Sequence, residues 1–162
     1  ADDVNSQSGD LFIYDGNWMN GLMHGKGELH YTNGDTYIGE FIQGKRHGNG
    51  ELQPGQSTDA GPQYIGEWEN DQIFGKGEIK NCHIESCSTS PGGLYEGNTL
   101  NGIPYGNGGY CAYTDGSEYL GEWRHGRRNG YGKFISASID IYEGKFVGNI
   151  RSGYGTLTMK SG

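Results

Sequence analysis

The sequence has few aliphatic residues, few prolines and few cysteines, and it lacks an excess of positive charge. No apolar run approaches the roughly 20 residues that a membrane-spanning helix needs. Acidic residues number 20 against 12 basic ones, which gives the 162 residues a net charge of −8. A balance of this sign argues against a nucleic-acid partner and against broad attraction to anionic lipid. Three cysteines, without a signal segment or an N-x-[ST] sequon, fit a reducing compartment.

The motifs that mark common catalytic and nucleotide sites are also missing. There is no G-x-x-x-x-G-K-[ST] loop, no G-x-S-x-G elbow and no H-E-x-x-H pair. A dinucleotide-binding fold needs strand–loop–helix units, and no segment has the 3.6-residue apolar period of a helix. We therefore predict that the chain is not an enzyme and that it needs no cofactor.

What the sequence does contain is glycine, at 32 of 162 positions, together with 12 tyrosines and 3 tryptophans. These residues recur in the order Y-x-G-x-aromatic-x-x-G-x-x-x-G-x-G. Six units follow this order, and they start at residues 14, 37, 64, 95, 119 and 142. The first two starts and the last two are 23 residues apart (37 − 14 and 142 − 119), and insertions follow the second and third units. Such self-similarity is the signature of a repeat protein.

Each unit alternates with period two, which predicts β-strands. In the first unit Tyr14, Gly16 and Trp18 fall on one face of the strand, and Asp15 and Asn17 fall on the other. Each unit is then a β-hairpin that turns at its middle glycine, while N-G and D-G pairs turn the chain between units. A strand glycine marks a close approach of another group. We expect these glycines to be seats for aromatic rings.

The frame resembles the MORN repeat (membrane occupation and recognition nexus), and the resemblance covers residues 14–162. Residues 1–13 form a lead-in that looks like the tail of an earlier unit. The departures from the frame are Thr99 in place of the aromatic residue, and Asp71 and Asn149 in place of the middle glycine. Because the sequence stops where another unit would begin, we expect it to be a domain cut from a longer protein.

These observations predict an all-β fold, a single-layer, elongated and twisted antiparallel sheet built from six consecutive β-hairpin repeats. A sheet with one aromatic face and no second layer is expected to leave that face partly exposed, and exposed apolar patches often mark binding sites. The predicted partner-binding groove consists of Tyr14, Trp18, Tyr37, Phe41, Tyr64, Trp68, Tyr95, Tyr119, Trp123, Tyr142 and Phe146.

Two further surfaces are candidate sites. Arg124, Arg127 and Arg128 cluster in "RHGRRNG", where they form either a contact for lipid and other anions or a solvated hairpin end. The last unit carries few charges that would discourage strand pairing, so we predict that the chain self-associates as a homodimer through it. The residues assigned to this contact are Tyr142, Phe146, Tyr154 and Leu157.

Metal sites are not predicted. His24 and His47 occupy a position that holds other residue types in the remaining units, so we expect them to fill a structural slot. Cys82, His83 and Cys87 lie in the long insertion without the further ligands of a zinc site. We expect free thiols in a surface loop there.

The resemblance implies a function as well as a fold. Repeats of this family have no catalytic activity of their own, and they are associated with scaffolding, self-association, helical partners held along the aromatic groove and phosphoinositide binding. We therefore expect a non-catalytic scaffold or adaptor that binds a protein or peptide and binds phosphoinositides weakly or not at all. We expect it in the cytoplasm, at the cytoskeleton or on the cytoplasmic side of a membrane. The alternatives are a phosphoinositide-binding, membrane-surface module and an accessory domain of a larger enzyme, such as a lipid kinase or methyltransferase.

Overall fold

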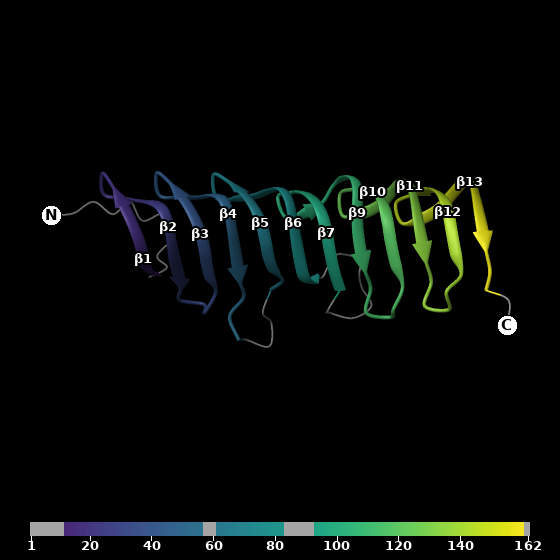
Figure 1. Ribbon diagram of the computed structural model, residues 1–162, viewed down its shortest axis with the longest axis horizontal. Helices are drawn as coiled ribbons and strands as arrows, with labels where there is room; N and C mark the ends of the chain where they lie inside the picture. The colour runs from purple at the N-terminus through teal and green to yellow at the C-terminus, as the bar shows by residue number, and fades with distance from the viewer. Residues whose placement is uncertain (1–11, 57–60, 83–92, 161–162) are drawn as a thin grey trace.

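The described part of the chain is one open antiparallel β-sheet. The computed structural model describes residues 12–56, 61–82 and 93–160, in which 13 strands form a single sheet. Figure 1 shows the strands side by side in one elongated row that runs from the N-terminal to the C-terminal end. No helix occurs within these ranges, and therefore none that could cross a membrane. The predicted all-β, single-layer antiparallel sheet is confirmed.

The strands follow one another along the sheet in chain order. They are β1 (Phe12–Met19), β2 (Leu22–Tyr31), β3 (Thr36–Ile42), β4 (Lys45–Gln53), β5 (Gln63–Glu69), β6 (Gln72–Cys82), β7 (Gly93–Leu100), β8 (Ile103–Pro104), β9 (Gly106–Ala112), β10 (Glu118–Arg124), β11 (Arg127–Ile135), β12 (Ile141–Val147) and β13 (Ile150–Thr158). Each strand pairs with the next one, except that the short β8 pairs only with β7, and β9 continues the sheet.

Each repeat is a hairpin with a two-residue tip. In the first unit Asn20 and Gly21 have φ values of 52° and 77°. Two positive φ angles are the mark of a type I′ turn, whose twist matches that of the flanking strands. The other tips with the same signs are Gln43–Gly44, Asn70–Asp71, Asn101–Gly102, His125–Gly126 and Gly148–Asn149. The predicted hairpins are therefore confirmed.

The turns after the first, fourth and fifth units are one residue longer than the tips. The Tyr31 carbonyl accepts from the Gly34 N–H, and the Tyr31 N–H donates to the Asp35 carbonyl, so residues 32–34 form the loop. Gly34 closes this loop with a φ of 90°. The predicted N-G turn is present, but it is part of a three-residue loop. The loop before the last unit has the same hydrogen bonds, and there Ile139 takes the place of glycine with a φ of 69°.

The glycines of neighbouring strands lie opposite each other and are covered by tyrosine rings. The tyrosine that starts each unit places its ring over the glycine two residues later and over that glycine's cross-strand partner. For Tyr119 these are Gly121 and Gly132, and its hydroxyl donates to the Glu122 carbonyl at 3.0 Å. A β-carbon on either glycine would overlap the ring. The predicted glycine seats are confirmed.

The fourth unit departs from the aligned frame. The last two glycines of the aligned frame are Gly106 and Gly108 in this unit. In the structure, however, it is Gly109 that lies against Gly97 and opposite Gly121. The unit has one more residue between its first glycine and this partner than the other units have. That extra residue interrupts the strand, which is why β8 and β9 are separate.

Candidate partner-binding surface

The rings of the predicted groove form the core of the protein. None of the nine rings from the second to the sixth unit is more than 7% exposed, and these are Tyr37, Phe41, Tyr64, Trp68, Tyr95, Tyr119, Trp123, Tyr142 and Phe146. Only the first unit differs: Tyr14 is half-buried and Trp18 is 59% exposed. The expectation that the aromatic face stays partly exposed is therefore wrong for these nine rings.

The rings are buried because neighbouring units cover one another. The tyrosines of the first, second and fifth units each pack edge-to-face against the aromatic residue of their own unit and against that of the next unit. Tyr37 lies 5.2 Å from Phe41 and 5.1 Å from Trp68, measured between ring centroids. Such pairs contribute about 0.5–1.5 kcal/mol beyond the area that they bury. The series is interrupted at Thr99, which is buried without a ring and whose hydroxyl donates to the Gly75 carbonyl at 3.3 Å.

The phenol hydroxyls and indole nitrogens of the buried rings have hydrogen-bond partners. The Trp68 Nε1–H donates to the Gly50 carbonyl at 3.2 Å, and the Trp123 Nε1–H donates to the Gly109 carbonyl at 2.9 Å, so each indole is bonded to the preceding unit. Burial raises the pKa of Tyr119 to about 12, and it also raises the pKa of Tyr37. The rings therefore hold neutral phenols in fixed positions, which suits a structural role.

The three arginines of the predicted basic cluster lie in different environments. The Arg128 guanidinium lies 4.9 Å from the centroid of Phe134 and donates to the Asn149 carbonyl at 3.2 Å. Arg128 is therefore half-buried and part of the packing between units. Arg124 and Arg127 are exposed beside the hairpin tip.

The four residues assigned to self-association differ in their exposure. Tyr142 and Phe146, on β12, are buried, whereas Tyr154 is 87% exposed and Leu157 is exposed on β13. A direct contact through all four residues is therefore excluded by burial, and only the last two are accessible.

The candidate ligands of the long insertion lie mostly outside the described residues. Cys82 ends β6, but its side chain is outside the described part of the structure, and so are His83 and Cys87.

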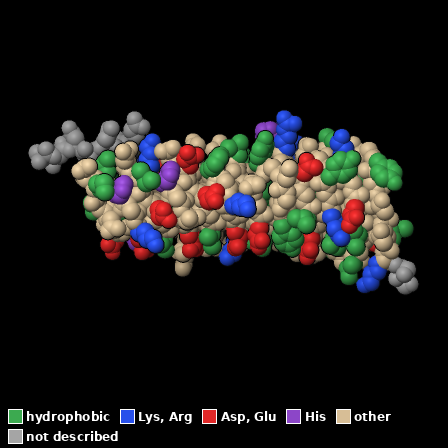
Figure 2. Space-filling model, turned by 45° about the horizontal axis from the view of Figure 1, so that its top comes forward, with side chains coloured by type: hydrophobic (Ala, Val, Ile, Leu, Met, Phe, Trp, Pro, Cys, Tyr) green, Lys and Arg blue, Asp and Glu red, His purple; other side chains and the backbone are tan. Residues whose placement is uncertain are grey.

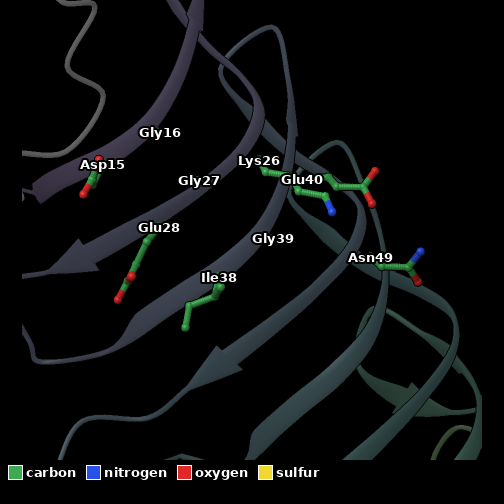
Figure 3. Close-up of a pocket in the computed structure, with 9 residues that line it drawn as sticks. All are labelled: Asp15, Gly16, Lys26, Gly27, Glu28, Ile38, Gly39, Glu40 and Asn49. Carbon is green, nitrogen blue, oxygen red and sulfur yellow. The ribbon is translucent and has the colours of Figure 1, made fainter.

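The opposite face of the sheet carries a furrow, which the pattern of aromatic residues did not reveal. Its volume is about 590 Å³ over the first two units. Figure 3 shows Asp15, Glu28 and Ile38 along one side, Lys26, Glu40 and Asn49 along the other, and Gly16, Gly27 and Gly39 between them. The floor is bare backbone, because a side chain at these three positions would point to the aromatic face.

One side of the furrow continues across the sheet as a row of carboxylates and isoleucines. Strand register places each residue of this row beside the next, and we call it the acidic row. Its members are Asp15, Glu28, Ile38, Glu51, Ile65, Glu78 and Glu96, on β1 to β7. Ile38 and Ile65 are exposed. No lysine or arginine stands in the row. Figure 2 shows acidic side chains spread along the visible face, with basic side chains beside several of them and hydrophobic ones in separate groups.

The carboxylates of the acidic row differ from the glutamates that later units carry at the position of Glu40. Glu67 accepts a hydrogen bond from the backbone N–H of Lys76, and Glu122 accepts one from Tyr131, so these two glutamates hold the bulged backbone. In the acidic row, Glu28 contacts His30 at 3.2 Å and Glu78 contacts Lys80 at 2.9 Å, both on the surface. Exposed pairs of this kind contribute little. The Glu28 and Glu78 carboxylates therefore remain accessible to a cationic ligand, whereas the Glu51 carboxylate already accepts from the side-chain amides of Gln53 and Gln63, at 2.9 and 2.6 Å.

Comparison with known proteins gives one family. The family model described as the MORN repeat matches residues 14–36, 37–53, 64–80, 119–138 and 142–162. The unmatched unit is the fourth, which has Thr99 and the extra residue. Alsin from Mus musculus and Alsin from Homo sapiens are each 33% identical over 155 residues, and Alsin from Rattus norvegicus is 27% identical. These alignments cover 92% of this chain and 9% of the length of each relative.

Proposed function

Because the chain belongs to the MORN repeat family, whose repeats form a non-catalytic module, we propose that it is an interaction module that binds a basic, amphipathic segment of a protein partner along the acidic row. The aromatic rings would then act as the support of this surface. A direct contact with the partner is proposed only for Tyr14 and Trp18, the rings that the first unit leaves accessible.

The observation that carries the proposal is the alternation of carboxylates with exposed isoleucines across the strands. Glu28, Glu51 and Glu78 stand on β2, β4 and β6, and Ile38 and Ile65 stand on β3 and β5 between them. A partner that matches this row needs positive charge at every second strand and an apolar group at the strands between. The net charge of −8 favours the approach of such a segment.

The dimensions of the sheet suit a helix that lies along its long axis. Neighbouring strands are about 4.8 Å apart, and an α-helix rises about 5.4 Å per turn, so such a helix advances about one turn per strand. Ile38 and Ile65 are two strands apart, roughly 9.6 Å, which is close to the rise of seven helical residues, about 10.5 Å. Apolar residues at i and i+7, with lysine or arginine on the turn between, would match the row.

A direct test uses two synthetic helical peptides and the purified chain. One peptide carries leucine at i and i+7 and lysine between, and the other carries glutamate in place of lysine. We expect the basic peptide to bind and the acidic peptide not to bind, with affinity that falls steeply as salt is raised, because the charges are exposed. Isothermal titration calorimetry measures both.

A matched pair of charge reversals locates the site. Glu28→Lys, in the acidic row, should weaken binding of the basic peptide about tenfold, which corresponds to about 1.4 kcal/mol. Glu69→Lys makes the same change of net charge at the exposed end of β5, outside the row, and should change binding less than about twofold. Equal losses in the two variants, or no binding of the basic peptide, would overturn the proposal.

A further inference from the structure

Neighbouring units are joined near their tips by a recurring contact. We count positions from the tyrosine that starts each unit, taken as zero, so that position 7 is the second tip residue and position 9 follows two residues later. The backbone N–H at position 7 donates to the carbonyl at position 9 of the preceding unit, as Gly44 does to Met23 at 2.9 Å. The same bond joins Asp71 to Arg46, Gly126 to Pro104 and Asn149 to Arg128.

The residue types at these two positions are matched. Where position 9 is arginine, position 7 of the next unit is Asp or Asn, in the pairs Arg46–Asp71 and Arg128–Asn149. Where position 9 is another residue, position 7 of the next unit is glycine, in the pairs Met23–Gly44, Ile73–Gly102 and Pro104–Gly126. All five junctions between the six units follow this rule.

The geometry of the arginine junctions explains the match. The Arg46 backbone N–H and Nε both donate to Asp71 Oδ1, at 2.9 and 3.2 Å, and Nη2 donates to the Asp71 carbonyl at 2.9 Å. The guanidinium also lies 4.4 Å from the centroid of Trp68. At the other junction the Arg128 backbone N–H donates to Asn149 Oδ1 at 2.8 Å.

Backbone conformation explains why glycine occupies the remaining junctions. Position 7 has a positive φ in every unit, for example 69° at Asp71 and 82° at Gly44. Glycine adopts this conformation without strain, whereas Asp and Asn adopt it at some cost. A side-chain oxygen at position 7 offsets this cost where the preceding unit donates to it. The backbone N–H at position 9 does so at both arginine junctions, and at Asp71 the Arg46 guanidinium adds a second bond through Nε.

The last unit presents a third arginine at position 9. Arg151 lies on the outer strand β13, and its guanidinium is 4.7 Å from the centroid of Tyr142, much as Arg46 lies over the rings of its own junction. Across residues 12–56, 61–82 and 93–160 no carboxylate or carbonyl accepts a hydrogen bond from the Arg151 guanidinium. Ile150 and Tyr154 on the same strand are exposed.

We propose that the β13 edge is a docking site for one further hairpin of this repeat type, with Asp or Asn at its position 7. The aromatic residue of that hairpin would cover Tyr142, as Phe146 covers Tyr119. The first unit of a second copy fits poorly, because its position 7 is Gly21. The last unit of a second copy also fits poorly, because its Asn149 already accepts from Arg128. This proposal is independent of the acidic row.

The test extends the chain by one unit. A copy of residues 140–162 added after Gly162 keeps the 23-residue spacing. One version carries aspartate at position 7, as in the Arg46–Asp71 junction, and a second version carries glycine there. We expect the aspartate version to have the higher urea midpoint, by about 0.5 M. We expect Arg151→Met to reduce this difference, because the bond from the guanidinium to the carboxylate is lost. A glycine version that is equally stable, or a difference that Arg151→Met leaves unchanged, would overturn the proposal.

Two measurements on the unextended chain complete the test. Arg46→Met and Asp71→Gly should each lower the urea midpoint, and the double variant, which has the Met23–Gly44 type of junction, should lose less than the sum of the two. Additive losses would contradict the matching rule. Light scattering then tests the β13 edge itself. A dimer that persists in Arg151→Met and disappears in the extended chain would assign the edge to a second copy and overturn the proposal.

Discussion

The phenol ring of Tyr119 lies across Gly132 on the neighbouring strand, and a β-carbon at position 132 would overlap the ring. The ring has no space to move aside, because it is packed edge-to-face against Trp123 and Phe146 and its hydroxyl is bonded to the Glu122 carbonyl. Glycine is therefore required at this position by contact with the ring, and its φ is not in the left-handed region.

This contact predicts a large effect of a small substitution. Gly132→Ala should lower the free energy of unfolding by about 2 kcal/mol or more, because overpacking forces the ring or the backbone to move. Urea denaturation measures the change. Gly61→Ala is the control, since position 61 is exposed, has no positive φ, and a β-carbon added there would meet no atom within 4 Å. A similar loss in both variants would show that the ring contact is not the cause.

A second prediction concerns Ile139, the branched residue in the loop before β12. Its φ of 69° lies in the left-handed region, and its side chain is exposed. The left-handed conformation costs a non-glycine residue roughly 1–2 kcal/mol. We expect Ile139→Gly to raise the free energy of unfolding by about 1 kcal/mol. Ile150→Gly, on an extended strand, should lower it instead, because glycine weakens strands. Destabilisation by both substitutions would refute the assignment of strain to Ile139.

The third prediction concerns alkaline pH. Burial raises the pKa of Tyr119 to about 12, and it raises the pKa of Tyr37 and Tyr64 in the same direction. A tyrosine whose pKa is raised in the folded state stabilises the fold fully below its unfolded pKa of about 10. That contribution is lost as pH rises from about 10 through the folded pKa. Urea midpoints should therefore be flat from about pH 7 to 9 and fall above about pH 10. Tyrosinate absorbance should show the buried rings ionising as the chain unfolds.

The fourth prediction separates the arginines of the basic tip. Binding to phosphoinositide liposomes at about 0.15 M salt should be weak, and Arg124→Glu with Arg127→Glu should remove what remains. Arg128→Met should lower stability by about 1–2 kcal/mol, because it removes a hydrogen bond to Asn149 and a cation–π contact. Liposome sedimentation and urea denaturation measure the two effects. Strong binding that survives the double charge reversal would contradict this division of roles.

Local patterns were sufficient to predict the hairpins and the seats of the rings. The alternation of Tyr14, Gly16 and Trp18 identifies the strand and its faces, because side chains on a strand alternate with period two. The two-residue tip at Asn20 and Gly21 also depends only on residues next to each other in the chain. For this reason the repeat, the all-β class and the contact of tyrosine with glycine could be predicted without tertiary information.

Contacts between units decided the rest. The sequence shows that Tyr37 and Phe41 share a face, but it does not show that Trp68 of the next unit closes over Tyr37 and buries it. In the sequence Arg128 is one member of a basic cluster. In the structure its guanidinium turns inward, where it donates to the Asn149 carbonyl of the next unit and lies over the Phe134 ring. The acidic row depends in the same way on strand register. Side-chain burial and direction are set by residues distant in the chain, so they follow from the packing of one unit on the next.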